Sequence, residues 1–243
     1  NFDMKATSTW LNYMTANGDM PRYYSTADEH GENKFGQLSF NGEERTGGIR
    51  HRILAGVDYG NKKFWGDFSS LLPSIPGDPL NVYNPVYGIP ESVFPKVDRT
   101  LNIKERAKSQ DYVTSSSYVS FYVHDEMAFL DDRLKLSLGL RYTSSNVVSK
   151  TNADPAKDKV WSPRVGVNYL IDPSMSVYAL FDQSFVPVSG LDWQGNALKP
   201  VRGNNLEAGL KKEWGGGKWI STLSVYQIKR KNAPVDDFDH PNP

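Results

Sequence analysis

The residues that could perform acid–base or metal chemistry are few and scattered along the chain. The four histidines are His30, His51, His124 and His240, and none stands in the His-Glu-x-x-His spacing that places two metal ligands on one face of a helix. His124 and Glu126 are two residues apart in an alternating stretch, so a strand would place both on one face. The pair has the groups for proton transfer, but a structural polar pair is the favoured interpretation.

Three further motifs are better explained as turns and loops. Asp131–Asp132 and Asp236–Asp237 could be thought metal-binding, yet aspartate pairs in these positions are typical of turns and solvated loops. Gly215–Gly217 is followed by a strand pattern, whereas a phosphate-binding glycine loop requires a helix after it. We therefore predict no catalytic residues, no metal ligands and no enzymatic activity.

The composition excludes several classes of protein. The 243 residues contain 28 Lys and Arg against 28 Asp and Glu, so the basic excess of a nucleic-acid-binding protein is missing. The sequence contains no cysteine, which excludes disulfide frameworks, zinc knuckles and thiol nucleophiles. The mean hydropathy of −0.55 is that of a polar, soluble protein. A membrane-spanning β-barrel is still compatible with that value, because its apolar residues occupy only every second position.

The elements that carry these residues are predicted to be strands, because apolar residues alternate with polar ones in many stretches. The clearest is Leu134–Tyr142, where a strand would place four leucines and a tyrosine on one face. Its other face would carry Lys135, Ser137, Gly139 and Arg141. We predict nine strands, at about 2–16, 34–43, 49–65, 113–129, 133–148, 159–170, 175–187, 203–214 and 218–232.

Short and long connections alternate along the chain. Short turns are expected near 44–48, 130–132, 172–174 and 215–217, and long loops near 17–33, 66–112, 149–158 and 188–202. The alternating strands fit both a soluble β-sandwich and a barrel in lipid. The regular alternation of short turns and long loops favours a transmembrane barrel, which has short periplasmic turns and long outer loops. The fold class is therefore an all-β, antiparallel, up-and-down transmembrane β-barrel segment, a single domain over residues 1–243.

The aromatic residues, which number 13 Tyr, 11 Phe and 6 Trp, fall into two groups. One group lies near predicted strand ends, where interfacial girdles form: Trp161, Tyr169, Trp214, Trp219, Tyr142 and Phe129. The other lies in or beside the long loops: Tyr23, Tyr24, Trp65, Phe68, Tyr83, Tyr87, Phe94 and Trp193. Loops are expected to be polar, so this second group indicates either binding or packing of the loops on one another.

Several segments together resemble the barrel of TonB-dependent ferric-siderophore receptors. The segments are Trp161–Val167, Ser176–Phe185, Asn205–Lys211, Tyr118–Glu126, Leu138–Tyr142, His51–Tyr59 and Asn81–Gly88, and their order and spacing carry the resemblance. It implies a 22-stranded barrel in the outer membrane of a Gram-negative bacterium, with an N-terminal plug domain inside the lumen. The sequence has no plug, no energy-coupling box and no C-terminal strand ending in an aromatic residue. We therefore expect a mid-barrel segment of a longer protein.

The resemblance also implies a function, uptake of iron-loaded siderophores energised by the TonB complex through the plug. Aromatic and basic side chains at the outer mouth would then hold the anionic iron chelate. The predicted ligand contacts are Trp193, Tyr83, Tyr87, Trp65, Phe68 and Arg202. The siderophore itself carries the iron, so no cofactor is expected. The partners are the siderophore, the TonB complex and outer-membrane lipid, and no nucleic acid is expected.

The inner face of the barrel is predicted to carry the charged residues of the alternating strands. These lumen-facing side chains are Arg141, Lys135, Arg164, Glu207, Lys211, His124 and Glu126. Other functions stay open at this point: a passive, porin-like diffusion channel, an outer-membrane barrel enzyme, and a soluble β-sandwich or lectin.

Overall fold

The computed structural model describes residues 1–11, 13–68, 70–72, 79–88, 90, 92, 94, 96–150 and 155–235, with the backbone alone at 9–11 and 70–72. The chain forms two compact units. The first comprises residues 1–33, 62–115 and 149–153, and the second comprises residues 34–61, 116–148 and 154–243. Asp236 and Asp237, one of the carboxylate pairs considered above, lie outside the described residues, as does His240.

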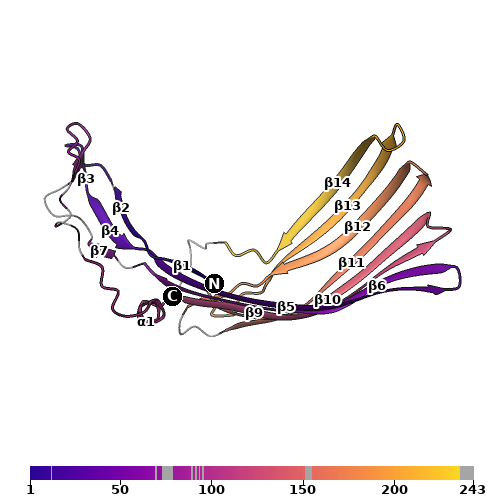
Figure 1. The fold of residues 1–243 in the computed structure, drawn as a ribbon, viewed down its shortest axis with the longest axis horizontal. Coiled ribbons are helices and arrows are strands. Elements are labelled where there is room, and N and C mark those ends of the chain that lie inside the picture. The colour runs from indigo at the N-terminus through magenta and orange to yellow at the C-terminus, as the bar shows by residue number, and fades with distance from the viewer. Residues whose placement is uncertain are drawn as a thin grey trace. The chain divides into compact units, whose positions relative to one another are not determined.

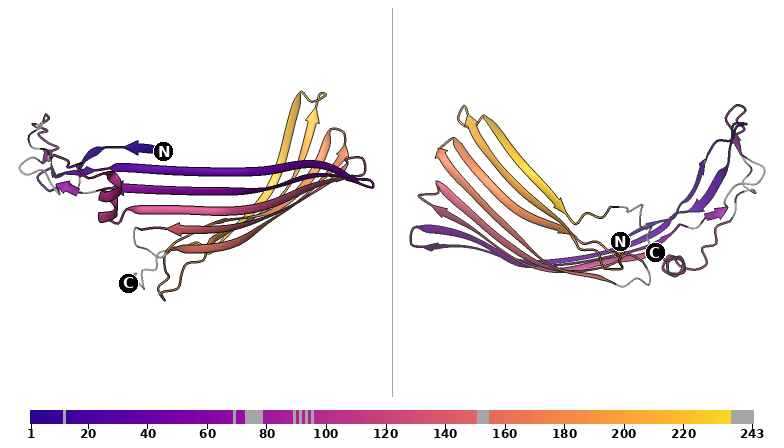
Figure 2. Two further views of the ribbon diagram at one scale, coloured as in Figure 1. Left: turned by 60° about the horizontal axis from the view of Figure 1, so that its bottom comes forward. Right: turned by 180° about the vertical axis from the view of Figure 1, so that it is seen from behind.

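A nine-stranded antiparallel sheet is the main element of the structure (Figure 1). Its strands pair in the order β1 (Phe2–Met4), β5 (Asp28–Thr46), β6 (Ile49–Asp67), β9 (Val113–Phe129), β10 (Leu134–Val148), β11 (Ala156–Asp172), β12 (Met175–Val186), β13 (Val201–Trp214) and β14 (Trp219–Lys231). The prediction of an all-β antiparallel fold of about nine strands is confirmed. In the second unit, β10 to β14 lie side by side in chain order in every view (Figure 2).

Tight turns join neighbouring strands at one end of the sheet. They lie at 47–48, 130–133, 173–174 and 215–218. Leu130, Asp131 and Asp132 all have positive φ angles, of 53°, 50° and 69°, and Gly215–Gly217 have φ angles between 60° and 88°. The glycines suit this conformation because they lack a Cβ atom. The first turn is shorter than the expected 44–48, because Glu44–Thr46 still pair within β5.

Several strands are longer than their alternating patterns indicated. β5 begins at Asp28 and not near residue 34, β6 continues to Asp67, and β11 starts at Ala156 and not near residue 159. Backbone pairing does not require an apolar face, so a strand continues into polar sequence once it has left the lipid. Strands of 12 to 19 residues exceed the roughly 9–11 needed to cross a bilayer.

The predicted loops 17–33 and 66–112 contain strands and a helix that the sequence analysis missed, and one of these strands pairs with part of the predicted strand 2–16. A three-stranded sheet pairs β2 (Thr7–Leu11), β4 (Arg22–Thr26) and β7 (Ser70–Leu72), and a two-stranded one pairs β3 (Asp19–Met20) with β8 (Leu80–Asn81). The predicted strand 2–16 is accordingly two strands in different sheets. Helix α1 (Ile103–Ser109) begins at Asn102, whose side chain accepts a hydrogen bond from the Glu105 backbone N–H, and it buries Ala107.

The register of the second unit separates an apolar face from a polar one. Leu138 pairs with Val165, Val165 with Phe181, Phe181 with Leu206, and directly paired residues point to the same side of a sheet. The apolar face is uncovered: Leu138 is 42% exposed and Leu206 56% exposed. A soluble sandwich would bury such a face against a second layer, whereas a single wall in lipid presents it outward.

Glycines on the polar face lie beside tyrosine rings of the next strand. A Cβ atom at Gly56 would fall 2.5 Å from the Tyr122 hydroxyl oxygen, and one at Gly209 would fall 2.6 Å from the ring of Tyr178. Each ring therefore lies across the backbone of its neighbouring strand. Among the described residues, no helix is long and apolar enough to cross a bilayer.

Candidate functional site

The first candidate segment is 79–88 in the first unit, which carries Tyr83 and Tyr87. Both rings are largely exposed, at 75% and 79%. Asn81 fixes the segment in place with both ends of its side-chain amide. Its Oδ1 accepts hydrogen bonds from the backbone N–H groups of Tyr83 (2.9 Å) and Asn84 (3.0 Å). Its Nδ2 donates to a second segment, at the Asn17 carbonyl (3.0 Å) and Asp19 Oδ1 (2.8 Å).

Backbone contacts strengthen the docking of these two segments. β3 pairs with β8 through Asp19–Asn81 and Met20–Leu80. Gly18 has a φ of 80°, and the Tyr83 ring lies so close that a Cβ atom there would be 2.4 Å away. The Tyr83 ring is therefore exposed to solvent but held against Gly18. Its position depends on residues about 60 positions earlier in the sequence.

The second candidate segment, 187–200 in the second unit, carries Trp193, which is 53% exposed. Asp192 organises it: Oδ1 accepts from the backbone N–H groups of Gln194 (3.0 Å) and Asn196 (2.8 Å). The Asn196 backbone N–H, followed by its side-chain amide, lowers the pKa of Asp192 below its usual range. A bridge between Leu191 and Ala197 closes the loop. All of these contacts are local.

The remaining predicted contacts in the first unit are packed against their neighbours. Trp65 is only 7% exposed, with the Lys104 ammonium 4.5 Å from its ring centroid and the His30 ring 5.4 Å away. Phe68 packs edge-on against Tyr112 at 5.2 Å and is 40% exposed. A ligand reaching this region would meet the Phe68 ring edge and the cation above Trp65, with little of the indole itself accessible.

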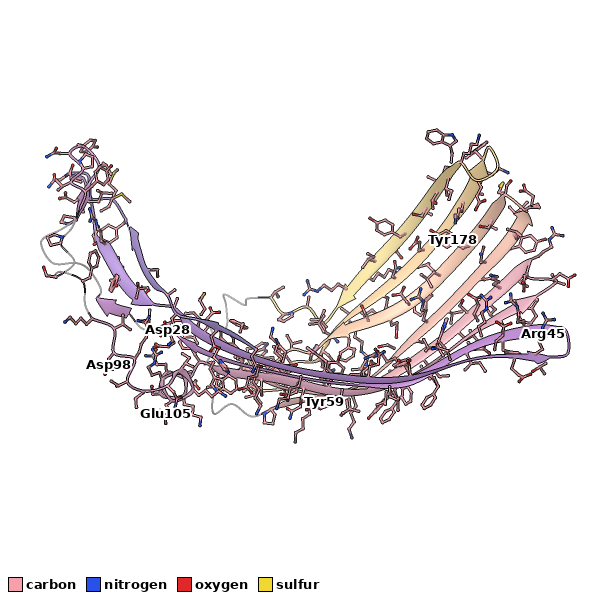
Figure 3. The ribbon with its side chains drawn as sticks, viewed as in Figure 1. Asp28, Arg45, Tyr59, Asp98, Glu105 and Tyr178 are labelled. Atoms are coloured by element: carbon pink, nitrogen blue, oxygen red, sulfur yellow. The ribbon has the colours of Figure 1, made fainter. Side chains whose placement is uncertain are left out.

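A buried ion network holds helix α1 and the segment before it onto the strands of the first unit. Asp28, 1% exposed, accepts two hydrogen bonds from Arg99, at 2.8 and 2.9 Å, and one from Arg106, at 2.6 Å. Arg106 also pairs with Asp67, which is 3% exposed. Figure 3 labels Asp28 together with Glu105, which lies on α1.

Asp28 is the first residue of the 19-residue β5 and lies at the end of the strand away from the short turn. It is therefore outside the roughly 9–11 residues next to that turn that are expected to cross the membrane. The hydrogen bonds from Arg99 lower the pKa of Asp28 to about 2, against the opposing effect of burial. Asp28 is therefore ionised at neutral pH.

The predicted ligand contact Arg202 lies within β13, just after the loop that carries Trp193. It pairs with Phe185, and its strand places it on the same side as Leu206 and Ala208. By register it belongs to the apolar, outward side of the second unit.

The seven residues predicted to face the lumen lie on the polar face of the second unit. Arg141 there forms an ion pair with Asp58 (2.6 Å) and donates to Ser120 (2.9 Å). Tyr178, labelled in Figure 3, donates to Glu207 at 2.6 Å. An open groove of about 840 Å³ lies along this face; its lining includes Lys135, Arg141, Arg164, His124 and Glu126.

His124 and Glu126 form no hydrogen bond or ion pair with each other, and Glu126 instead lies near Arg52 (3.7 Å) and Lys135 (3.8 Å). Within the described ranges, no three His, Asp or Glu side chains gather in a way that could hold a metal ion. The geometry thus offers stacking surfaces and charged walls.

Sequence reasoning missed three sets of residues that organise these regions. They are Asn81; Asp28 with Arg99 and Arg106; and the pair His51–Asp125. Asp125 interrupts an apolar face, and His51 meets it there at 2.8 Å. That interruption was the one available signal, because the other partners are far apart in the sequence.

Comparison with known proteins identifies the family. The TonB dependent receptor-like β-barrel family model matches residues 1–243. The ferrioxamine B receptor of Salmonella typhimurium is 30% identical over 238 residues, covering 94% of this chain and 30% of that receptor. The metal-pseudopaline receptor of Pseudomonas aeruginosa is 27% identical, with 90% and 31% covered.

Solved structures agree on the fold. The ferric preacinetobactin receptor of Acinetobacter baumannii superposes with a TM-score of 0.69 at 22% identity, over 93% of this chain and 33% of that one. The chain therefore spans about a third of the length of the proteins that it matches. It belongs to the TonB-dependent receptor-like β-barrel family, which comprises outer-membrane proteins of Gram-negative bacteria.

Proposed function

We propose that the chain forms part of the wall and outer mouth of a receptor that imports an iron-loaded siderophore. The observation that carries the proposal is the pair of exposed aromatic loops, each held in one conformation by a polar side chain. A ring that is fixed before binding loses little conformational entropy when a ligand stacks on it. The relatives named above are receptors for ferrioxamine B and for metal-pseudopaline, which supports a chelate as ligand.

The mechanism contains no covalent step. Tyr83, Tyr87 and Trp193 would provide stacking surfaces. Arg22, whose guanidinium donates a hydrogen bond to the carbonyl oxygen of Val86 (3.2 Å) beside Tyr87, would offset the charge of an anionic chelate. The siderophore holds the iron throughout, so the protein supplies no ligand to the metal. The barrel would close with strands outside this chain into the 22-stranded form, around a plug that couples it to the TonB complex.

The experiment is binding of ferric siderophores to a full-length receptor containing this chain. Tyr83→Ala and Trp193→Ala should each weaken the affinity for the bound chelate about threefold to tenfold, as loss of one aromatic contact predicts. Trp219→Ala is the matched control, since Trp219 is 74% exposed beside a short turn. Affinities unchanged across a hydroxamate and catecholate panel would remove both loops from the site.

A passive channel makes a different prediction. It would conduct small solutes through the purified, reconstituted receptor without an energy source. The proposed receptor should remain closed under those conditions and should release chelate only when the TonB complex is energised. An open, ohmic conductance would replace the proposed function with the channel.

A further inference from the structure

His30, the third residue of β5, lies between two carboxylates in the first unit. Its Nδ1 is 2.6 Å from Asp3 Oδ1, and its Nε2 is 3.2 Å from Glu32 Oε1. Asp3 belongs to β1 and pairs directly with His30 in the register, whereas Glu32 follows two positions later on β5. The imidazole is only 14% exposed, so it forms both contacts between the two strands largely out of solvent.

Both contacts together require the protonated ring. A neutral imidazole has one N–H donor and one acceptor nitrogen, so one of its nitrogens would present a lone pair to a carboxylate oxygen. The imidazolium ion donates from both nitrogens. The hydrogen bond to Asp3, followed by that to Glu32, accordingly raises the pKa of His30 above its ordinary value of 6.5, against the opposing effect of burial.

The other groups around the ring come from α1 and β6. Lys104 of α1 forms an ion pair with Glu32, and its ammonium lies 4.5 Å from the centroid of the Trp65 ring, which also packs on His30 at 5.4 Å. Lys104 opposes the protonation of His30, whereas Asp3 and Glu32 favour it. With His30 protonated, the cluster contains two carboxylates and two cations, and with His30 neutral it contains one carboxylate in excess. The proton on His30 therefore balances the charge of the cluster.

The carboxylates beside this cluster stay charged when His30 titrates. The backbone N–H of Ala6, just after β1, donates to Asp28 Oδ1 at 3.2 Å, and the pKa of Asp28 is about 2. The hydrogen bond from Lys104 lowers the pKa of Glu32 to about 2 as well. His30 can thus gain or lose its proton near neutral pH while Asp28 and Glu32 keep their charges.

We propose that His30 is a pH-sensitive contact that holds β1 onto the start of β5. Asp3 favours the proton on His30, and linkage is reciprocal, so the proton strengthens the contact with Asp3 by the same factor. The folded-state pKa is raised, so this stabilisation is fully present below pH 6.5 and is lost as the pH rises through the raised value. The inference concerns the attachment of a strand and does not depend on the proposed siderophore function.

The test measures amide hydrogen exchange in the full-length receptor at pH 6 and pH 9, corrected for the intrinsic pH dependence of exchange. Protection of residues 2–4 and 29–31 should fall about threefold to tenfold between the two, as weakening of one charge-assisted hydrogen bond at a partly exposed site predicts. His30→Gln should show the lower protection at both pH values, because glutamine does not take up a proton. Glu29→Gln is the matched control and should behave as wild type, since Glu29 pairs with Met4 and points to the opposite face.

A permanently charged residue separates the charge of the ring from its presence. Arginine stays protonated throughout this range, so His30→Arg should keep its protection at pH 9. Asp3→Asn should remove most of the pH dependence, and it serves if heat-modifiable electrophoretic mobility shows that the His30 variants are misfolded. An equal fall in protection for wild type and His30→Gln would overturn the proposal, and so would protection that rises with pH. All samples lack siderophore, so the result is independent of the proposed function.

Discussion

The two aromatic loops are held in place by different means. Segment 79–88 of the first unit depends on Asn81, whose amide reaches Asn17 and Asp19 more than 60 residues earlier. Segment 187–200 of the second unit depends on Asp192, whose carboxylate accepts hydrogen bonds from residues two and four positions later. One loop is docked onto a distant segment, and the other is folded on itself.

The difference teaches which perturbations each loop tolerates. A locally folded loop keeps its conformation when its surroundings move, and it is sensitive to the ionisation of Asp192. The conformation of the docked loop does not depend on pH through Asn81, because an amide does not titrate. It does depend on the positions of the strands and turns around it. The first unit extends this dependence on distant partners to its helix, through Asp28 and Arg106.

Replacing Arg106 should have the largest effect on the docked region. Arg106→Ala removes one of the partners of Asp28 and the ion pair between Arg106 and Asp67, and breaking a buried pair costs about 3–5 kcal/mol. Limited proteolysis should then cleave within 98–112 first. Lys108→Ala on the same helix is the control, since Lys108 is exposed. Equal protease resistance of both variants would mean that the network does not hold the helix.

Asn81→Ala should release the docked loop alone. It removes four hydrogen bonds, each with a net contribution of about 0.5–1.5 kcal/mol, so a loss of about 2 kcal/mol is expected after partial replacement by water. Amide hydrogen exchange should accelerate in both 15–20 and 80–84. Asn84→Ala is the matched control, because only the backbone of Asn84 takes part. Faster exchange in 80–84 alone would show that the two segments are not coupled.

Asp192→Ala should affect only its own loop. Exchange should accelerate in 192–197 and nowhere in the first unit, because Asp192 accepts its hydrogen bonds from Gln194 and Asn196 in the same loop. Asp192→Asn keeps an oxygen acceptor and should retain most of the protection. If the asparagine variant behaves like alanine, the charge and not the geometry organises the loop.

Low pH should affect the order of the Asp192 loop and leave the Asn81 loop unchanged, and this is the smallest of the expected effects. The pKa of Asp192 is depressed, so its contribution to loop order is fully present above the ordinary aspartate pKa of 3.8 and is lost as pH falls through the depressed value. Asn81 does not titrate. The fluorescence difference between wild type and Trp193→Phe should therefore stay constant from pH 7 to 4 and change below. A change near pH 6 would contradict this assignment.

The sequence predicted those parts of the fold that are encoded locally. The alternation at Leu134–Tyr142 and the turn at Gly215–Gly217 each depend on residues next to one another, and the strands and turns follow from them. The β3–β8 pair joins residues 62 positions apart, between Asp19 and Asn81, and no periodicity marks so short a strand. The helix α1 was missed for the same reason. Its seven residues are anchored by Arg106 to Asp28 on β5 and Asp67 on β6, which are far away in the sequence.

The candidate site divides in the same way. Asp192–Gly195 has the composition of a turn, so the fixed Trp193 loop was readable in principle. The role of Asn81 was not, because its partners come from another segment. Arg202 was expected just past a loop, and the extension of β13 to Val201 brings it into the strand, on the same side of the sheet as Leu206. Its ligand contact stays a prediction. The ligand contacts of Tyr83, Tyr87 and Trp193 remain predictions for the binding experiment.

The glycines beside the tyrosines determine how far the tyrosine rings project from the polar face of the sheet. Because Gly56 and Gly209 have no side chain, Tyr122 and Tyr178 lie flat across the neighbouring backbone and do not stand upright. A Cβ atom at either position would fall within 2.7 Å of the tyrosine ring, and at Gly56 it would also lie 2.6 Å from the backbone oxygen of Leu38, so the ring or the neighbouring strand would have to move. How far these rings project from the polar face of the sheet is therefore set by residues that have no side chain.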